Sequence, residues 1–237
     1  MQISKEEIRD FYNEYVDYQS IQLNNERHYY VLELLKKNGL KKNSKVVDLG
    51  CGIGAFTALV ARYCKKGIVK GYDLSDKSIE FASNHYSKLR NVAFITTDIT
   101  SHSFAAKYEI DYVLLIDVLE HIPRDEHEFL FKKIESILND NTKLIINIPY
   151  YAALQYEKNN NKDVLQIIDE PVELFYLLSL SEKLNLEIKQ VETFDMWQKE
   201  EYQFIVMEKK KDYVFTRLIP KKLNLIKKVI RKLKTIF

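Results

Sequence analysis

The chain has 237 residues, of which 46% are apolar and 12% aromatic. This length suits one large or two small domains, and the apolar content is enough for a sizeable core, which excludes intrinsic disorder as the main description. The longest stretches without a charged residue, 49–61 and 144–156, are shorter than the roughly 18–20 apolar residues that cross a bilayer. The first ten residues lack the apolar run of a secretory signal, and two cysteines are too few for a disulfide framework. We therefore expect a cytoplasmic protein without a membrane span.

The net charge of +2 is unevenly distributed along the chain. From residue 209 onward there are 11 Lys and Arg against one acid, whereas the rest of the chain carries 25 against 33. Residues 220–237 place their apolar side chains on one helical arc and nearly all their bases outside it, which predicts a basic amphipathic helix. Such a helix suits the anionic inner face of the cell membrane, and docking on protein or binding of nucleic acid are the alternatives.

Helical stretches open the chain. Apolar residues recur at helical spacing between residues 5 and 38, and Gly39 is a typical helix stop. Residues 1–40 are therefore predicted to form an N-terminal helical cap.

Short apolar strands then alternate with amphipathic helices, which is typical of a parallel sheet covered by helices on both faces. The predicted strands are 45–49, 67–72, 92–95, 111–116 and 143–148, and the predicted helices are 55–64, 76–87 and 125–138. Residues 150–169 are expected to form a loop or small lid, and 171–184 a helix. Strands at 186–191 and 202–207 have no helix between them, which predicts an antiparallel last strand. The expected fold is thus an α/β domain over 41–208 with a doubly wound, mostly parallel seven-stranded sheet, followed by the basic helix within 209–237.

The clearest motif is VVDLGCGIGAFT, residues 46–57, in which an apolar strand runs into a glycine-rich turn and a helix. Gly50, Gly52 and Gly54 let the backbone turn tightly and approach a ligand, and the helix start attracts a carboxylate or phosphate. The spacing also fits the dinucleotide pattern G-x-G-x-x-G/A, with Asp73 about 20 residues further on. Asp48, at the strand end, favours a ligand with an ammonium group over a pyrophosphate, which it would repel. S-adenosylmethionine carries an ammonium group and a sulfonium.

Here the sequence resembles the class I S-adenosylmethionine-dependent methyltransferases, whose first motif, an acid followed by G-x-G-x-G, begins at Asp48. The resemblance extends over about residues 40 to 150 and implies a Rossmann-like fold. It implies that Asp73 binds the ribose hydroxyls and Asp98 the adenine amino group, with Ile99 beside the ring. It also implies that LLIDVLEHIP, residues 114–123, lies near the transferable methyl group. The cofactor-binding residues expected on this basis are Asp48, Gly50, Cys51, Gly52, Gly54, Asp73, Leu74, Ser75, Asp98, Ile99, Asp117 and Val118.

Asp117, Glu120 and His121 follow a buried strand, at the edge where open parallel sheets bind ligands. His121 is the candidate catalytic base, because an imidazole with a pKa of about 6.5 can take a proton from an acceptor hydroxyl. Methyl transfer from a sulfonium is a direct displacement, so alignment of the reacting atoms supplies much of the acceleration. The alternative is that these three residues hold Mg²⁺, but beyond His127 there is no well-placed second histidine. We expect S-adenosylmethionine as the cofactor and no metal ligands.

Two further segments bear on the acceptor. His28, Tyr12, Tyr15 and Tyr18 either belong to a helical cap over the cofactor or form one face of an ordinary amphipathic helix. NIPYY, residues 147–151, differs from the N-P-P-Y motif of amino-methylating DNA enzymes in its second residue and its strand, so nucleic acid is disfavoured as a partner.

The expected function is S-adenosylmethionine-dependent O-methylation of a hydroxyl. The segment 113–123 resembles enzymes that act on quinones and on bacterial surface glycans. We expect a sugar or lipid-linked glycan of surface polysaccharide synthesis as acceptor, with a quinone or small molecule at the membrane surface as the alternative. An NAD-dependent oxidoreductase and a non-catalytic cofactor-binding module are the competing classes.

Overall fold

The structure, a computed structural model, describes residues 3–21, 23–101 and 109–212. The predicted basic helix at 220–237 lies outside these residues, so its three alternatives stay predictions.

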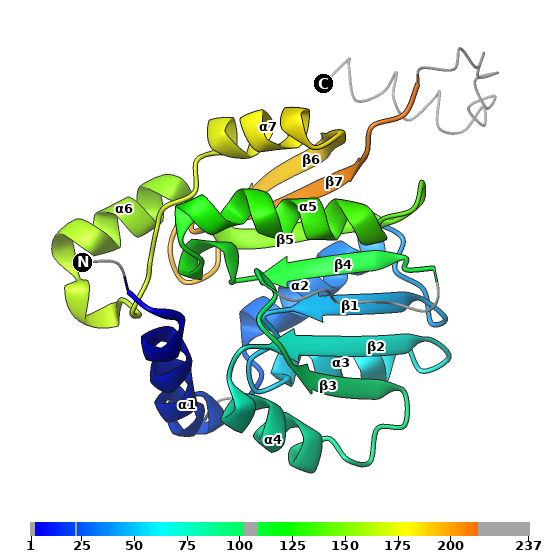
Figure 1. The fold of residues 1–237 in the computed structure, drawn as a ribbon, viewed down its shortest axis with the longest axis horizontal. Helices are drawn as coiled ribbons and strands as arrows, with labels where there is room; N and C mark the ends of the chain where they lie inside the picture. The colour runs from blue at the N-terminus through cyan, green and yellow to red at the C-terminus, as the bar shows by residue number, and fades with distance from the viewer. Residues whose placement is uncertain (1–2, 22, 102–108, 213–237) are drawn as a thin grey trace, which may run out of the picture.

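A seven-stranded sheet of order β3-β2-β1-β4-β5-β7-β6 forms the centre of the described part of the chain (Figure 1). Its strands are β1 (Lys45–Leu49), β2 (Ile68–Asp73), β3 (Val92–Thr96), β4 (Tyr112–Ile116), β5 (Lys143–Pro149), β6 (Leu186–Phe194) and β7 (Tyr202–Lys209). The strands β1 to β5 are parallel, and β7 runs antiparallel to both β5 and β6. The predicted Rossmann-like, doubly wound, mostly parallel sheet with an antiparallel last strand is confirmed.

Helices cover both faces of this sheet because both faces of its central strands are apolar. In Figure 1, α5 (His127–Ile137) and α7 (Leu174–Lys183) lie in front of the sheet, and α2 (Glu26–Lys37) and α3 (Ala55–Tyr63) lie behind it. Alternate strand residues supply the two cores: Val47 belongs to the cluster that includes residues of α5 and α7, whereas its neighbour Val46 belongs to the cluster that includes residues of α2 and α3. All five residues of β4 are buried, as expected for a strand between two helical layers.

The first helix, α1 (Lys5–Ile21), is attached differently from α2. It lies against α4 (Asp76–His85), and its Val16 joins a small apolar cluster with Ile53 and Ala55 that is separate from the two main cores. Asn13 Oδ1 accepts a hydrogen bond of 2.7 Å from Ser75 Oγ. The helix α1 is therefore held by polar contacts and a small apolar cluster, whereas α2 contributes Val31, Leu34 and Leu35 to a main core.

The segment predicted as a loop or lid differs from the expectation. Residues Tyr151–Asn160 form α6, followed by a short 3-10 turn at Lys162–Val164. The stretch is rich in strong helix formers, but Leu154 is its one buried residue. A helix with so little buried surface lacks the apolar periodicity by which helices are predicted from sequence.

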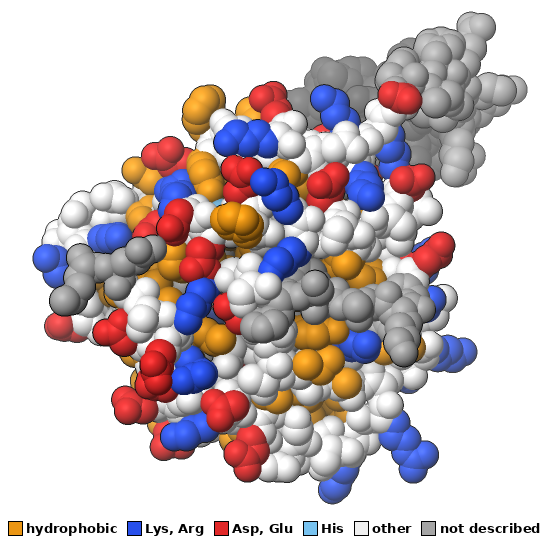
Figure 2. All heavy atoms as spheres, viewed as in Figure 1, with side chains coloured by type: hydrophobic (Ala, Val, Ile, Leu, Met, Phe, Trp, Pro, Cys, Tyr) orange, Lys and Arg blue, Asp and Glu red, His pale blue; other side chains and the backbone are white. Residues whose placement is uncertain are grey.

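Charges of both signs mix on the surface. On the face shown in Figure 2, acidic and basic side chains are interspersed, with hydrophobic side chains visible between them. Within the described residues, no helix combines the length and the apolar character needed to cross a membrane.

Candidate active site

The candidate site is a cavity of about 510 Å³ at the carboxyl ends of β1, β2 and β4. The strand order reverses between β1 and β4, and this is the point at which doubly wound sheets bind ligands. Most of the predicted site residues line the cavity: Asp48, Gly50, Cys51, Gly52, Asp73, Leu74, Asp98, Ile99, Asp117, Val118 and His121. Gly54 and Ser75 are instead the N-caps of α3 and α4. The structure thus brings the predicted residues to one place, from four separate segments.

The glycine turn between β1 and α3 is packed too tightly for side chains. Gly50 has φ +75°, and a Cβ there would lie 2.5 Å from Val118 Cγ2. Gly54 also has φ +75°, and its Cβ would lie 2.5 Å from Phe94. Both the left-handed backbone and the close approach require glycine, so the turn is fixed as one wall of the cavity.

Asp48, at the end of β1, is a buried carboxylate with a hydroxyl partner. Thr57 Oγ1 donates a hydrogen bond of 2.6 Å to Asp48 Oδ2. Burial raises the pKa of Asp48 to about 7, with the nearby Asp73 adding to the effect and the Thr57 bond opposing it. Among the described residues no cationic side chain forms an ion pair with Asp48, so a cationic group of a ligand would be stabilised here.

Asp73 ends β2 and connects it to the glycine turn. Its Oδ2 accepts from Gly52 N at 2.7 Å, and its Oδ1 accepts from Ser75 N at 2.9 Å. Burial raises the pKa of this carboxyl, while backbone N–H groups of Ser75, Gly52 and Leu74 oppose the rise. A fixed carboxylate facing a cavity can accept hydrogen bonds from neighbouring hydroxyls, such as those of a ribose.

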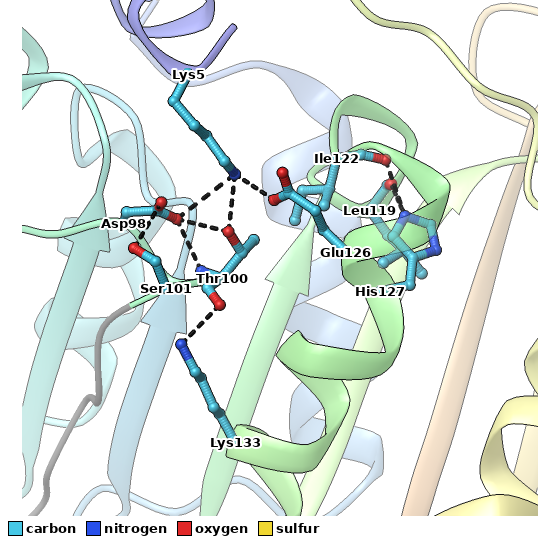
Figure 3. A network of polar contacts seen from close by, with 9 residues as sticks. All are labelled: Lys5, Asp98, Thr100, Ser101, Leu119, Ile122, Glu126, His127 and Lys133. Atoms are coloured by element: carbon cyan, nitrogen blue, oxygen red, sulfur yellow. Dashed lines mark hydrogen bonds and ion pairs between the residues drawn. The ribbon is translucent and has the colours of Figure 1, made fainter. Parts of the chain in front are cut away.

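Asp98 follows β3 and sits in a network that reaches α1 (Figure 3). It accepts hydrogen bonds of 2.8 Å from the Thr100 N–H, the Thr100 hydroxyl and the Ser101 hydroxyl. Lys5 Nζ lies 3.7 Å from Asp98 Oδ1, donates to Thr100 Oγ1 at 2.8 Å and pairs with Glu126. Burial alone would raise the pKa of Asp98, but these hydrogen bonds and the Lys5 charge lower it. Lys5 therefore connects the first residue of α1 to the part of the cavity wall that Asp98 and Thr100 form.

Asp117 follows β4 in a left-handed conformation, with φ +55°. Asn147 Nδ2 donates to its Oδ1 at 2.9 Å, and Arg27 Nη2 lies 2.6 Å from its Oδ2. Strained conformations of this kind in non-glycine residues cluster at functional sites. In this conformation the Asp117 carboxylate lines the cavity and reaches Arg27 of α2.

His121 is held by the segment that precedes α7. Its Nδ1–H donates to the Ile168 carbonyl at 2.7 Å and lies 3.2 Å from Asp169 Oδ1. Burial lowers the pKa of His121, but Glu120 and Asp169 outweigh it and raise the pKa to about 9. The imidazole is therefore protonated at neutral pH, and the pKa of about 6.5 expected from sequence does not apply to His121. To act as a general base, His121 must first lose this proton.

The three residues considered as Mg²⁺ ligands, Asp117, Glu120 and His121, are not arranged around a common metal position. Asp117 is paired with Arg27, and Glu120 Oε1 lies 3.9 Å from His121 Nε2. In the parts of the chain that are described, no three His, Cys, Asp or Glu side chains are placed to hold a metal ion.

Several site residues were not predicted from sequence. Lys5, Arg27 and Gln166 line the cavity, and Asp169 holds His121 from outside it. Tyr12, Tyr15, Tyr18 and His28, suggested as a cap, also line the cavity. The unpredicted residues belong to no motif, and only their contacts across the fold identify them.

Residues 46–141 match the family model described as a methyltransferase domain. Over 98 residues the chain is 35% identical to (S)-coclaurine N-methyltransferase of Thalictrum flavum subsp. glaucum, covering 40% of this chain and 26% of that protein. Over 103 residues it is 33% identical to the ubiquinone biosynthesis O-methyltransferase of Vibrio cholerae, covering 43% of this chain and 40% of that protein. The chain thus matches well under half the length of either relative.

Solved structures share the fold over most of the chain. A protein from Pyrococcus horikoshii OT3 superposes with a TM-score of 0.65 at 24% identity, covering 82% of this chain and 99% of that one. Magnesium protoporphyrin IX methyltransferase from Synechocystis PCC 6803, with bound SAM, has a TM-score of 0.65 at 16% identity, covering 89% and 99%.

The fold and the glycine-loop half of the site define a class I methyltransferase domain. Residues 46–141 thus match a methyltransferase domain, so the predicted resemblance is confirmed over this segment. The predicted cofactor, S-adenosylmethionine, is bound in a solved structure of the same fold.

Proposed function

We propose that this chain transfers a methyl group from S-adenosylmethionine to a hydroxyl of a small acceptor. The observation that carries the proposal is the pair of buried carboxylates, Asp48 and Asp73, that line one cavity beside a glycine turn without a cation partner among the described residues. A ligand with both a cationic group and a diol fits this pair, whereas the phosphates of a dinucleotide would meet two negative charges.

The residues divide into a cofactor side and an acceptor side. Asp48 would bind the ammonium group, Asp73 the ribose hydroxyls, and Asp98 with Ile99 the adenine. The cofactor, when bound, supplies a methyl group on a positively charged sulfur. Asp117 and His121 also line the cavity, and we place the acceptor beside them. There a new oxygen–carbon bond would form as the carbon–sulfur bond breaks and the hydroxyl proton leaves to a base.

Replacement of Lys5 by methionine is expected to weaken binding of S-adenosylhomocysteine by about three- to tenfold. The change removes the contacts of Lys5 with Asp98, Thr100 and Glu126, and a partly exposed ion pair of this kind contributes on the order of 1 kcal/mol. Titration calorimetry measures the effect. Lys65→Met, at an exposed position away from the cavity, is the matched control, and equal affinities for the two variants would contradict the role of Lys5.

For the acceptor we propose a sugar or lipid-linked glycan hydroxyl, with a quinone hydroxyl as the second candidate. Tyrosines 12, 15 and 18 line the cavity together with acidic residues, and aromatic rings beside hydrogen-bonding groups suit both sugars and aromatic alcohols. The likeness to a ubiquinone O-methyltransferase favours the second candidate. A cytoplasmic location at the inner face of the membrane, through 220–237, would suit either acceptor.

The test is transfer of labelled methyl from S-adenosylmethionine into an extract of the source organism, separated into organic, water-soluble and nucleic-acid fractions. Organic label that mild acid releases as a water-soluble sugar supports the lipid-linked glycan, and acid-stable organic label supports the quinone. Label in nucleic acid, or no transfer at all by protein that binds S-adenosylhomocysteine, would contradict the proposal and favour a non-catalytic module.

A further inference from the structure

A lysine-rich surface lies at the edge of the sheet where the parallel strands begin, opposite the cavity. The segments that lead into β1, β2 and β3, residues 36–45, 62–70 and 86–93, contain 11 Lys and Arg and no acid. At the lower right of Figure 2, beside the starts of these strands, the charged side chains in view are basic. The exposed bases between each helix and the strand that follows it, here called the basic edge, are Lys41, Lys42, Lys65, Lys66, Lys88 and Arg90.

Hydrogen bonds hold the three connections of the basic edge side by side. The Lys66 N–H donates to the Lys42 carbonyl at 2.8 Å, and Asn91 Nδ2 donates to the Cys64 carbonyl at 3.0 Å. None of the six basic side chains forms an ion pair or a side-chain hydrogen bond with another residue that the structure describes. Like charges that lie close together without counter-charges repel one another, and an anionic partner would relieve this repulsion.

The opposite edge of the sheet carries the reverse charge. Acids follow the carboxyl ends of the strands around the cavity, and α1, which also lines the cavity, has five acids and two bases. The strand β1 has five residues, so about 16 Å separates the two edges. This separation exceeds the Debye length of about 8 Å at physiological ionic strength. A charged surface that meets the basic edge is therefore little affected by the acids of the cavity edge.

The described chain ends at the same edge as these bases. The strand β7 runs antiparallel to β5, so its last residue, Lys209, lies near the start of β5. Lys210 and Lys211 follow and are exposed, and the Lys210 N–H donates to the Asn185 carbonyl at 2.8 Å. Residues 213–237, which lie outside the described residues, contain Lys and Arg but no acid. The basic end of the chain therefore starts from the edge that is already basic.

We propose that the basic edge binds an anionic phospholipid surface and that the domain lies on it with the cavity facing away from the lipid. Each base near such a surface adds to the attraction. Ile68, 42% exposed at the start of β2, adds an apolar side chain beside Lys66, and the amphipathic helix predicted at 220–237 would add an apolar face. Proteins that bind single-stranded nucleic acid combine bases with exposed aromatic rings, whereas Ile68 is aliphatic. The inference concerns the edge away from the cavity and does not depend on the proposed function.

The first test is sedimentation of the whole chain with vesicles at low salt. We expect binding to vesicles of equal parts phosphatidylglycerol and phosphatidylcholine, and none to phosphatidylcholine alone. The triple variant Lys42→Gln, Lys65→Gln, Lys66→Gln should bind the anionic vesicles about ten- to 100-fold more weakly, because three bases leave the contact.

The matched control removes the same charge from exposed lysines elsewhere on the domain, by Lys77→Gln, Lys162→Gln and Lys199→Gln. Its binding should stay within about threefold of wild type. Equal affinities of the two triple variants would overturn the inference, since the net charge alone would then govern binding. Wild-type protein that binds single-stranded RNA but no anionic vesicles would overturn it in favour of a nucleic-acid surface.

The second test determines which edge faces the lipid. The chain has one tryptophan, Trp197, which contacts Tyr202 beside the carboxyl end of β5 and so lies at the cavity edge. Anionic vesicles with brominated acyl chains, which quench tryptophan fluorescence at short range, should leave Trp197 unquenched in bound protein. The same vesicles should quench protein that carries Ile68→Trp together with Trp197→Phe. Quenching of Trp197, or no quenching in the Ile68→Trp protein, would show that another surface meets the lipid and would overturn the inference.

Discussion

Replacement of His121 by alanine is expected to slow methyl transfer by about 10²- to 10⁴-fold, the usual contribution of a positioned acid or base. His121 lines the cavity, and its Nδ1 is held by the Ile168 carbonyl and Asp169. An imidazole fixed through Nδ1 leaves Nε2 as the atom that can exchange a proton. Initial rates with saturating cofactor measure the effect, and binding of S-adenosylhomocysteine should be unchanged because the cofactor acids are intact.

The pH dependence of the rate separates a base from a packing residue. Burial lowers the pKa of His121, but Glu120 and Asp169 raise it to about 9, so only a small fraction of the imidazole is unprotonated at pH 7. If His121 is the base, the wild-type rate rises with pH until about 9. In Asp169→Asn the pKa of His121 falls, and the rise should move to lower pH. A profile that is flat across this range, or one that Asp169→Asn leaves in place, would contradict the role.

Replacement of Asp73 by alanine is expected to weaken binding of S-adenosylhomocysteine by about 100-fold or more. The ligand hydroxyls would lose the carboxylate that accepts their hydrogen bonds, and each such charge-assisted bond contributes about 1.5–3 kcal/mol. Gly52 N would lose its acceptor at the same time, which loosens the glycine turn.

Calorimetry measures this loss of affinity directly. Asp76→Ala is the matched control, because Asp76 is exposed in the first turn of α4, three residues beyond Asp73. Its affinity should match that of wild type. If Asp73→Ala bound as tightly as Asp76→Ala, the assignment of Asp73 to the ribose would be wrong.

Sequence alone predicts the glycine turn and the strand before it well, because local patterns determine them. The strand at 45–49 was expected with the bounds that the structure has. Gly50 and Gly54 were expected at a tight turn, and each adopts a left-handed φ that favours glycine. Strand ends carry the acids, so the order of strands in the sheet brings those acids together.

The other residues around the cavity were less predictable because their positions depend on contacts between distant segments. Lys5 pairs with Glu126, which is 121 residues away in the chain, and Asp169 reaches His121 from the segment before α7. Neither contact has a periodic or motif signal. The helix α6 escaped prediction for a related reason, since Leu154 is its only buried residue.

The family match covers only part of the residues around the cavity. The family match covers residues 46–141 and therefore includes Asp48, Asp73 and Asp98. Tyr12, Arg27, His28 and Asp169 lie outside it. The relatives of the chain include both an N-methyltransferase and an O-methyltransferase. The family match therefore does not identify the acceptor.

The central claim is that the cavity beside the glycine turn binds S-adenosylmethionine, and titration calorimetry of the whole chain with S-adenosylhomocysteine tests it most directly. The account predicts binding of one equivalent, at an affinity that falls by about 100-fold in Asp73→Ala, and no heat of binding with NAD. Binding of NAD without binding of S-adenosylhomocysteine would contradict the account and would identify the glycine turn as a dinucleotide site.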